Sequence, residues 1–202
     1  MIRPRKRTHD LTPVHPDLRK AWRRFPKFPF NRWTLRPIRW LMDLMPPLSD
    51  SDHIHISRTL AQSADAGLSV KLRIYRPEAI AEPVPALLWM HGGGFVVGNA
   101  KMEDAYLTKF VKALGIVVIS VDYRLAPDHP YPAAIDDCYT ALRWVHAQAG
   151  SLGVDPDRIA IGGESAGGGL AASLAQLVYD RGKVSPVFQL LVYPMLDDRS
   201  AL

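Results

Sequence analysis

Short runs of apolar residues alternate along the chain with longer segments in which apolar residues recur at helical spacing. A short apolar run is typical of a strand buried on both faces, and helical spacing is typical of an amphipathic helix. We expect strands over 86–90, 116–121, 158–162 and 187–193, and helices over 102–114, 131–149 and 166–179. The alternation predicts an α/β fold: a mostly parallel sheet with helices on both faces and ligands at the carboxyl ends of its strands.

Two more strands are expected upstream, over 53–60 and 68–75, because apolar and polar residues alternate in both segments. A turn at 64–67 would join them. In the second strand one face carries the apolar side chains, Leu68, Val70, Leu72 and Ile74. We expect this face to pack on the core.

Positive charge is concentrated at the start of the chain. Residues 1–40 hold 12 Lys+Arg against two Asp+Glu, a net charge of +10, whereas residues 41–202 carry a net charge of −5. The basic segment also contains six prolines and the aromatic residues Trp22, Phe25, Phe28, Phe30, Trp33 and Trp40. Three interpretations stay open: a solvated extension, short helices that lie over a binding site, and a segment that contacts a membrane surface through its aromatic residues.

Composition is that of an ordinary globular protein, with 48% hydrophobic and 22% charged residues. No apolar stretch approaches the ~18–20 residues of a membrane span, and the basic N-terminus lacks the apolar core of a secretory signal. The one cysteine, Cys138, excludes an intrachain disulfide and a cysteine metal cluster. We expect a cytoplasmic protein without metal or cofactor, and no nucleic-acid partner because no nucleic-acid-binding motif is present.

The first glycine-rich motif, Gly163-Glu164-Ser165-Ala166-Gly167, lies between an expected buried strand and an expected helix. In a sharp strand-to-helix turn, side chains at Gly163 and Gly167 would collide with the backbone. The turn would lift the Ser165 hydroxyl out of the sheet, close to a helix N-terminus where negative charge is favoured. The alternative is that Ser165 only caps the helix.

The second motif, His91-Gly92-Gly93-Gly94-Phe95, directly follows another buried strand. Consecutive glycines let backbone N–H groups point into a cavity, as acyl transfer requires for its developing oxyanion. A phosphate cradle fits less well, because neither the dinucleotide glycine pattern nor the P-loop lysine is present.

Three further motifs accompany these two: Asp122-Tyr123-Arg124-Leu125-Ala126-Pro127, Tyr131-Pro132-Ala133-Ala134 and Tyr193-Pro194-Met195-Leu196-Asp197-Asp198-Arg199. Taken together over residues 70–202, the five motifs resemble the hormone-sensitive-lipase-like esterases, the bacterial family IV of α/β-hydrolases. The resemblance implies an α/β-hydrolase core at 51–202, incomplete at its C-terminus with about six of eight strands, and a cap or lid at 1–50. It also implies a small-molecule substrate, a carboxylic ester of short to medium acyl chain.

The same resemblance assigns roles to residues of the motifs. Ser165 would be the nucleophile, and the backbone N–H groups of Gly93, Gly94 and Ala166 would form the oxyanion hole. Structural roles within the motifs fall to His91, Gly92, Asp122, Gly163, Glu164 and Gly167. Glu164 departs from the family, since many members have Asp at this position.

The family's triad acid and base should follow Ser165 in the chain, but every histidine precedes it: His9, His15, His53, His55, His91, His129 and His146. We expect His129 to be a turn residue and His146 a surface residue, and Asp136 and Asp137 to serve the dipole of their helix. The 202 residues are expected to be the N-terminal part of a longer hydrolase, nearly inactive alone. A non-catalytic ligand-binding protein of the same fold and a membrane-surface protein are the alternatives.

Overall fold

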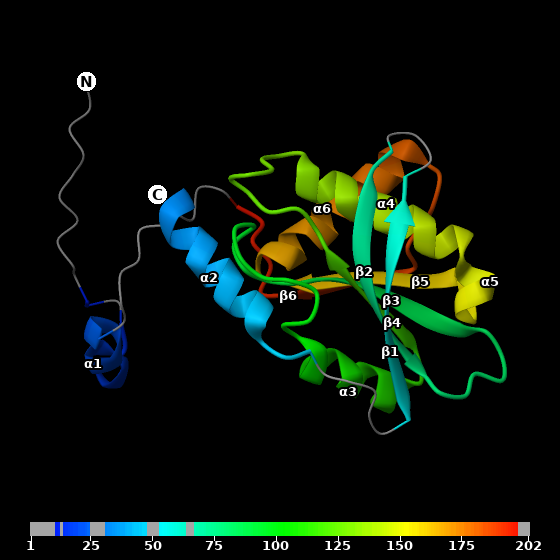
Figure 1. Cartoon of the computed structure of the whole chain (residues 1–202), viewed down its shortest axis with the longest axis horizontal. Helices are drawn as coiled ribbons and strands as arrows, with labels where there is room; N and C mark the ends of the chain where they lie inside the picture. Colours follow the sequence, from blue (N-terminus) through cyan, green and yellow to red (C-terminus); the bar gives the residue numbers. More distant parts are fainter. Residues whose placement is uncertain (1–10, 13, 25–30, 48–52, 64–66, 198–202) are drawn as a thin grey trace.

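One sheet of six strands runs through the part of the chain that the structure describes, in the order β1-β2-β4-β3-β5-β6 (Figure 1). The computed structural model describes residues 11–12, 14–24, 31–47, 53–63 and 67–197. The strands are β1 (Ile54–Gln62), β2 (Ser69–Pro77), β3 (Val84–Met90), β4 (Val117–Asp122), β5 (Val154–Glu164) and β6 (Phe188–Val192). β1, β2 and β4 pair antiparallel and all other neighbours pair parallel, so the predicted α/β fold is confirmed.

Helices cover both faces of the sheet (Figure 1). α4 (Ala133–Ala147) and α6 (Ala166–Arg181) pack on one face, where they share a core with the predicted apolar side of β2. α3 (Asp104–Leu114) packs on the other face, against Tyr75, Trp89 and Val118. No helix of the described residues is both long and apolar enough to cross a bilayer.

Most element boundaries differ from the prediction by one or two residues, and three of the differences have a local explanation. α3 begins at Asp104, after a turn, and ends where predicted at Gly115, which has φ 63°. α4 begins after Pro132, since a residue before proline avoids helical backbone angles, and the short helix α5 (Ala149–Leu152) follows it separately. β5 starts four residues earlier than expected because Val154 pairs with Val84 across an irregularity in the register.

The basic N-terminal segment contains two helices, α1 (Pro16–Arg24) and α2 (Arg32–Leu44). α1 buries no residue, and in Figure 1 it stands apart from the sheet. Trp33 and Trp40 of α2 are exposed, at 83% and 63%. Phe25, Phe28 and Phe30, together with most of the predicted turn at 64–67, lie outside the described residues.

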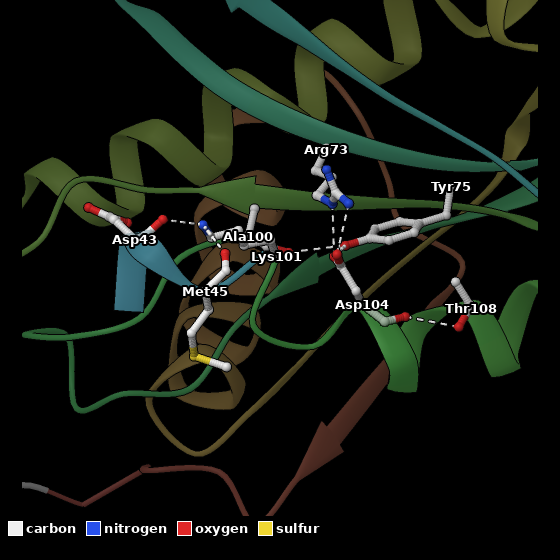
Figure 2. Close-up of polar contacts among 8 residues, drawn as sticks. All are labelled: Asp43, Met45, Arg73, Tyr75, Ala100, Lys101, Asp104 and Thr108. Carbon is white, nitrogen blue, oxygen red and sulfur yellow. Dashed lines mark hydrogen bonds and ion pairs between the residues drawn. The ribbon is translucent and has the colours of Figure 1, made fainter. Parts of the chain in front are cut away.

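α2 is attached to the loops that follow β3 and β4. Its Arg39 donates hydrogen bonds to the carbonyl oxygens of Val96 at 2.8 Å and Ala126 at 2.5 Å, and forms an ion pair with Asp128 at 2.7 Å. At the end of α2, the carbonyl oxygens of Asp43 and Met45 accept hydrogen bonds from Lys101 at 2.6 and 2.8 Å (Figure 2). These bonds hold α2 beside the carboxyl ends of the strands.

Candidate active site

A sharp turn joins β5 to α6 at Ser165, whose backbone angles are φ 52° and ψ −117°. A positive φ is uncommon for serine and persists only where the surroundings hold it. The Ser165 N–H donates to the carbonyl oxygen of Val192 at 2.9 Å, and the Ser165 carbonyl oxygen accepts from the N–H of Met195 at 3.0 Å. The Ser165 side chain makes no capping hydrogen bond to α6. The alternative interpretation, in which the side chain of Ser165 caps the helix, is therefore not what the structure shows.

The glycines on either side of Ser165 are required by close backbone approach. A Cβ on Gly167 would come closer than 3.0 Å to the carbonyl oxygen of Met90, and one on Gly163 would come equally close to the carbonyl oxygen of Gly167. Gly163 also pairs with Met90 in the sheet. The turn at Ser165 consequently lies directly beside the end of β3, where the second glycine-rich motif begins.

The loop after β3 exposes backbone N–H groups. Gly93 has φ 121° and Gly94 has φ 62°, and Val96 and Val97 both donate to the carbonyl oxygen of Gly93, at 3.1 and 3.0 Å. Within the described residues, no backbone acceptor is found for the N–H groups of Gly93, Gly94 or Ala166. These three N–H groups follow the ends of two adjacent strands, β3 and β5.

His91 is enclosed in the protein rather than open to a substrate. Its ring is fully buried, stacks on Tyr123 with 4.2 Å between ring centroids, and places Nδ1 2.7 Å from the carbonyl oxygen of Gly92. The hydroxyl of Tyr123 donates to the carbonyl oxygen of His91 at 2.8 Å. Burial lowers the pKa of His91 to about 4, so the ring is neutral at pH 7.

Two aspartates lie near this region, Asp122 at the end of β4 and Asp137 in α4. Asp122 accepts a hydrogen bond from the N–H of Ala100 at 3.3 Å, and burial raises the pKa of its carboxyl group. Asp137 was expected to serve the dipole of its helix, and this expectation is wrong. Its side chain is buried and accepts hydrogen bonds from Arg124, from the backbone N–H at 2.8 Å and from Nη2 at 2.8 Å. It therefore fixes the loop after β4.

Sequence reasoning missed Glu103, although it sits under the glycine loop. Glu103 is buried and accepts hydrogen bonds from the N–H of Gly92 at 3.3 Å and from Nε1 of Trp89. Its carboxyl group also interacts with that of Glu164, which accepts a hydrogen bond from the hydroxyl of Tyr193 at 2.6 Å. A glutamate just before a helix is ordinary in sequence, so only the fold reveals its burial.

The described histidines lie in several places. His53 and His55 lie at the start of β1 and His15 directly before α1, while His129 and His146 are exposed. His129 borders a cavity of about 800 Å³ that Phe95, Gly169 and Met195 also line. None of these rings forms a hydrogen bond with the Ser165 hydroxyl.

In the described part of the chain, no three His, Cys, Asp or Glu residues are grouped to hold a metal ion. Cys138 is buried, as expected.

Curated relatives are named as ester hydrolases. Over 163 residues, the chain is 41% identical to carboxylesterase NlhH of Mycobacterium tuberculosis, covering 81% of this chain and 49% of that protein. It is 45% identical over 137 residues to esterase LipI of the same species, covering 67% of this chain and 42% of that protein. The chain thus spans about half the length of these relatives.

Solved structures of esterases have a similar fold over the part that this chain covers. A bacterial heroin esterase is 40% identical, with a TM-score of 0.77, and the match covers 92% of this chain and 59% of that one. An esterase from Pyrobaculum calidifontis is 33% identical with a TM-score of 0.73, covering 90% and 59%. The family model of the alpha/beta hydrolase fold matches residues 87–201. The chain belongs to the α/β-hydrolase fold family, among the hormone-sensitive-lipase-like esterases.

Proposed function

We propose that this chain carries the nucleophile and the oxyanion hole of a carboxylic-ester hydrolase. The observation that carries the proposal is the backbone of Ser165, held at φ 52° at the start of α6 with its hydroxyl free of any capping bond. Such a strained serine, between a strand and a helix, is the arrangement that presents a nucleophile in this fold. The names of the relatives support the reaction class.

The reaction proceeds through an acyl-enzyme. The Ser165 oxygen attacks the ester carbonyl carbon, and the negative charge that develops on the carbonyl oxygen is bound by the N–H groups of Gly93, Gly94 and Ala166. Collapse of this intermediate releases the alcohol, which takes up a proton, and leaves the acyl group on Ser165. Water then attacks the acyl-enzyme and releases the acid. The steps use no metal and no cofactor, and the substrate is an ester of short to medium acyl chain.

The general base comes from outside these 202 residues. A serine hydroxyl is a weak nucleophile at pH 7 unless an adjacent base accepts its proton. His91 is neutral but fully buried against Tyr123, and His129 and His146 make no bond to Ser165. Loss of the base costs on the order of 10⁶ in turnover in a well-studied serine hydrolase, so these residues alone would be nearly inactive.

Residues 1–50 act as the cap of the active site and residues 51–202 as its core. Support comes from Arg39 of α2, which binds the carbonyl oxygens of Val96 and Ala126 on the loops beside the glycine motif. Lys101 holds the end of the same helix (Figure 2). A cap at this place limits which esters reach Ser165.

Hydrolysis of p-nitrophenyl butyrate by the protein expressed from its complete reading frame tests the proposal. We expect Ser165→Ala to abolish turnover, with a loss on the order of 10⁶. Ser185→Ala is the matched control, since Ser185 is exposed and borders a different cavity, with Pro156 and Lys183. Turnover that survives Ser165→Ala would overturn the proposal. Absence of turnover in the unmodified protein, with saturable binding of the ester, would instead favour a non-catalytic binding protein.

A further inference from the structure

Two glutamates from different segments meet beneath the glycine loop. Glu103 directly precedes α3, and Glu164 directly precedes Ser165 at the end of β5. Each carboxyl group interacts electrostatically with the other. The position of a Cβ on Gly92 would lie 2.9 Å from Oε1 of Glu164, and the N–H of Gly92 donates to Oε1 of Glu103 at 3.3 Å. Both carboxyl groups therefore contact the same glycine.

The place of Glu103 is fixed by its neighbour in the chain. Asp104 forms a buried ion pair with Arg73, Nη2 to Oδ2 at 2.7 Å, and accepts a hydrogen bond from the hydroxyl of Tyr75 at 2.6 Å (Figure 2). The same hydroxyl lies 3.1 Å from the carbonyl oxygen of Ala100. These contacts hold the start of α3 against β2, so the Glu103 carboxyl group has little freedom to move away from Glu164.

Two ionised carboxylates placed together would repel each other, whereas a carboxyl group that keeps its proton can donate it to its neighbour. Among the described residues, no lysine or arginine hydrogen-bonds to either group. The titratable groups around the pair are His91, Tyr106, Tyr123 and Tyr193. His91 is buried and neutral, and the three tyrosines carry no positive charge. A proton held between the carboxyl groups is therefore what makes their contact favourable.

We propose that Glu103 and Glu164 share one proton and that this pair holds the oxyanion-hole loop against the serine turn, which makes Glu103 a positioning residue. The inference rests on the proposed function, because the loop matters only if Gly93 and Gly94 bind an oxyanion. In the singly protonated pair, each neighbouring N–H or O–H donor has a carboxyl oxygen as its acceptor. Glu103 accepts from Trp89 and Gly92, and Glu164 accepts from Tyr193.

When the shared proton is lost, both carboxyl groups are negatively charged and repel each other beside Gly92. Burial raises the pKa of Glu103 to about 7, so this loss falls within the range in which esterases are assayed. Above that pH the glycine loop and the serine turn are pushed apart. The rate of ester hydrolysis should decline relative to a variant in which the pair cannot lose its proton.

Glu164→Gln is that variant, because its amide N–H can donate to Glu103 while its amide oxygen accepts from Tyr193. Glu103→Gln also removes the titration, but its amide nitrogen cannot accept, so the N–H of Trp89 or of Gly92 loses its partner. We expect the rate of Glu103→Gln to lie about tenfold below that of Glu164→Gln. The exposed Glu82→Gln is the matched control.

The first measurement is independent of catalysis. In the protein expressed from its complete reading frame and labelled with ¹³C-glutamate, carboxyl signals are followed by NMR across about pH 4–9. One carboxyl group should titrate near pH 7. This titration should vanish in Glu103→Gln, move to lower pH in Glu164→Gln, whose amide N–H stabilises the charged form of Glu103, and persist in Glu82→Gln. If every glutamate titrates at its ordinary value, or the near-neutral titration survives both substitutions, the pair does not share a proton.

The second measurement is ester hydrolysis in a pH-stat by the protein expressed from its complete reading frame. The ratio of the Glu164→Gln rate to the unmodified rate should rise as the pH passes about 7. A ratio that does not change with pH would overturn the positioning role. If Ser165→Ala hydrolyses the ester as fast as the unmodified protein, the proposed function fails and the positioning role fails with it. The NMR titration then still reports whether the two carboxyl groups share a proton.

Discussion

Arg73 and Asp104 form a buried, two-pronged ion pair between β2 and the start of α3, with Nε to Oδ1 at 2.8 Å and Nη2 to Oδ2 at 2.7 Å (Figure 2). Their side chains are only 6% and 7% exposed. An ion pair removed from water this completely is costly to break, because the remaining partner keeps its charge in an apolar surrounding.

Asp104→Asn should therefore destabilise the protein strongly. We expect the free energy of unfolding to fall by about 3–5 kcal/mol, since an amide carries no charge to balance that of Arg73. Urea unfolding followed by fluorescence measures the loss. Asp155→Asn is the control, because Asp155 pairs with Arg158 at the exposed surface and its replacement should change little. Equal effects of the two substitutions would show that the buried pair contributes no more than a surface pair.

Gly167→Ala should disrupt the serine turn. The added Cβ would come closer than 3.0 Å to the main-chain carbonyl oxygens of Met90 and His91, and backbone cannot move aside as a flexible side chain can. We expect a loss on the order of 3 kcal/mol in the free energy of unfolding. Gly150→Ala is matched, since Gly150 lies in α5 with nothing within 4 Å of an added Cβ. This control should be neutral or more stable by about 0.5–1 kcal/mol. Unfolding curves of the two variants that coincide would contradict the expected clash.

The alternation of strands and helices could be predicted from the sequence because each buried strand and helix stripe repeats a local pattern. Val70, Leu72 and Ile74 share the core with α4 and α6 as that pattern required. The opposite face of β2 could not be interpreted in this way. Arg73 looks like an exposed residue in an alternating strand, and its burial depends on Asp104, which lies 31 residues away.

The candidate site also contains some features that a local sequence pattern predicts and others that it does not. The two glycine motifs are contiguous in sequence, so their places at the ends of β3 and β5 could be predicted. Glu103 and Tyr193 reach the site through contacts with Gly92 and Glu164, which no local pattern encodes. The actual partner of Asp137 was missed for a similar reason, since a carboxylate close to the start of a helix has an adequate local explanation.

Arg39 should decide whether α2 stays attached to the loops after β3 and β4. Its guanidinium group has three acceptors in different directions, the carbonyl oxygens of Val96 and Ala126 and the Asp128 carboxylate. Arg39→Lys cannot replace this geometry, because an ammonium group is a compact point charge. We expect amide hydrogen exchange in α2 to accelerate about tenfold in Arg39→Lys, as measured by mass spectrometry. Arg36→Lys, at an exposed position of the same helix, should leave the exchange unchanged. Equal exchange in both variants would contradict the anchoring role.

The buried ring of His91 should make the protein less stable in acid. Burial lowers the pKa of His91 from 6.5 to about 4, so the folded protein binds this proton less readily than the unfolded chain. Its contribution to stability is complete above pH 6.5 and is lost as the pH falls through about 4. The loss amounts to about 3 kcal/mol, because each pKa unit corresponds to about 1.4 kcal/mol.

Glu103 has the opposite effect to His91 on the pH dependence of stability, so the contributions of the two groups can be separated. Its pKa is raised from 4.5 to about 7, so its contribution is complete below pH 4.5 and is lost as the pH rises through about 7. In the unmodified protein the two slopes oppose each other over the window between about 4.5 and 6.5. Glu164→Gln replaces the neighbouring carboxylate by an amide and lowers the pKa of Glu103, so its free energy of unfolding should fall more steeply with acid than that of the unmodified protein. Urea midpoints measured across this window test the difference, with Glu82→Gln expected to parallel the unmodified protein. Parallel curves for Glu164→Gln would show that the carboxyl pair does not oppose His91.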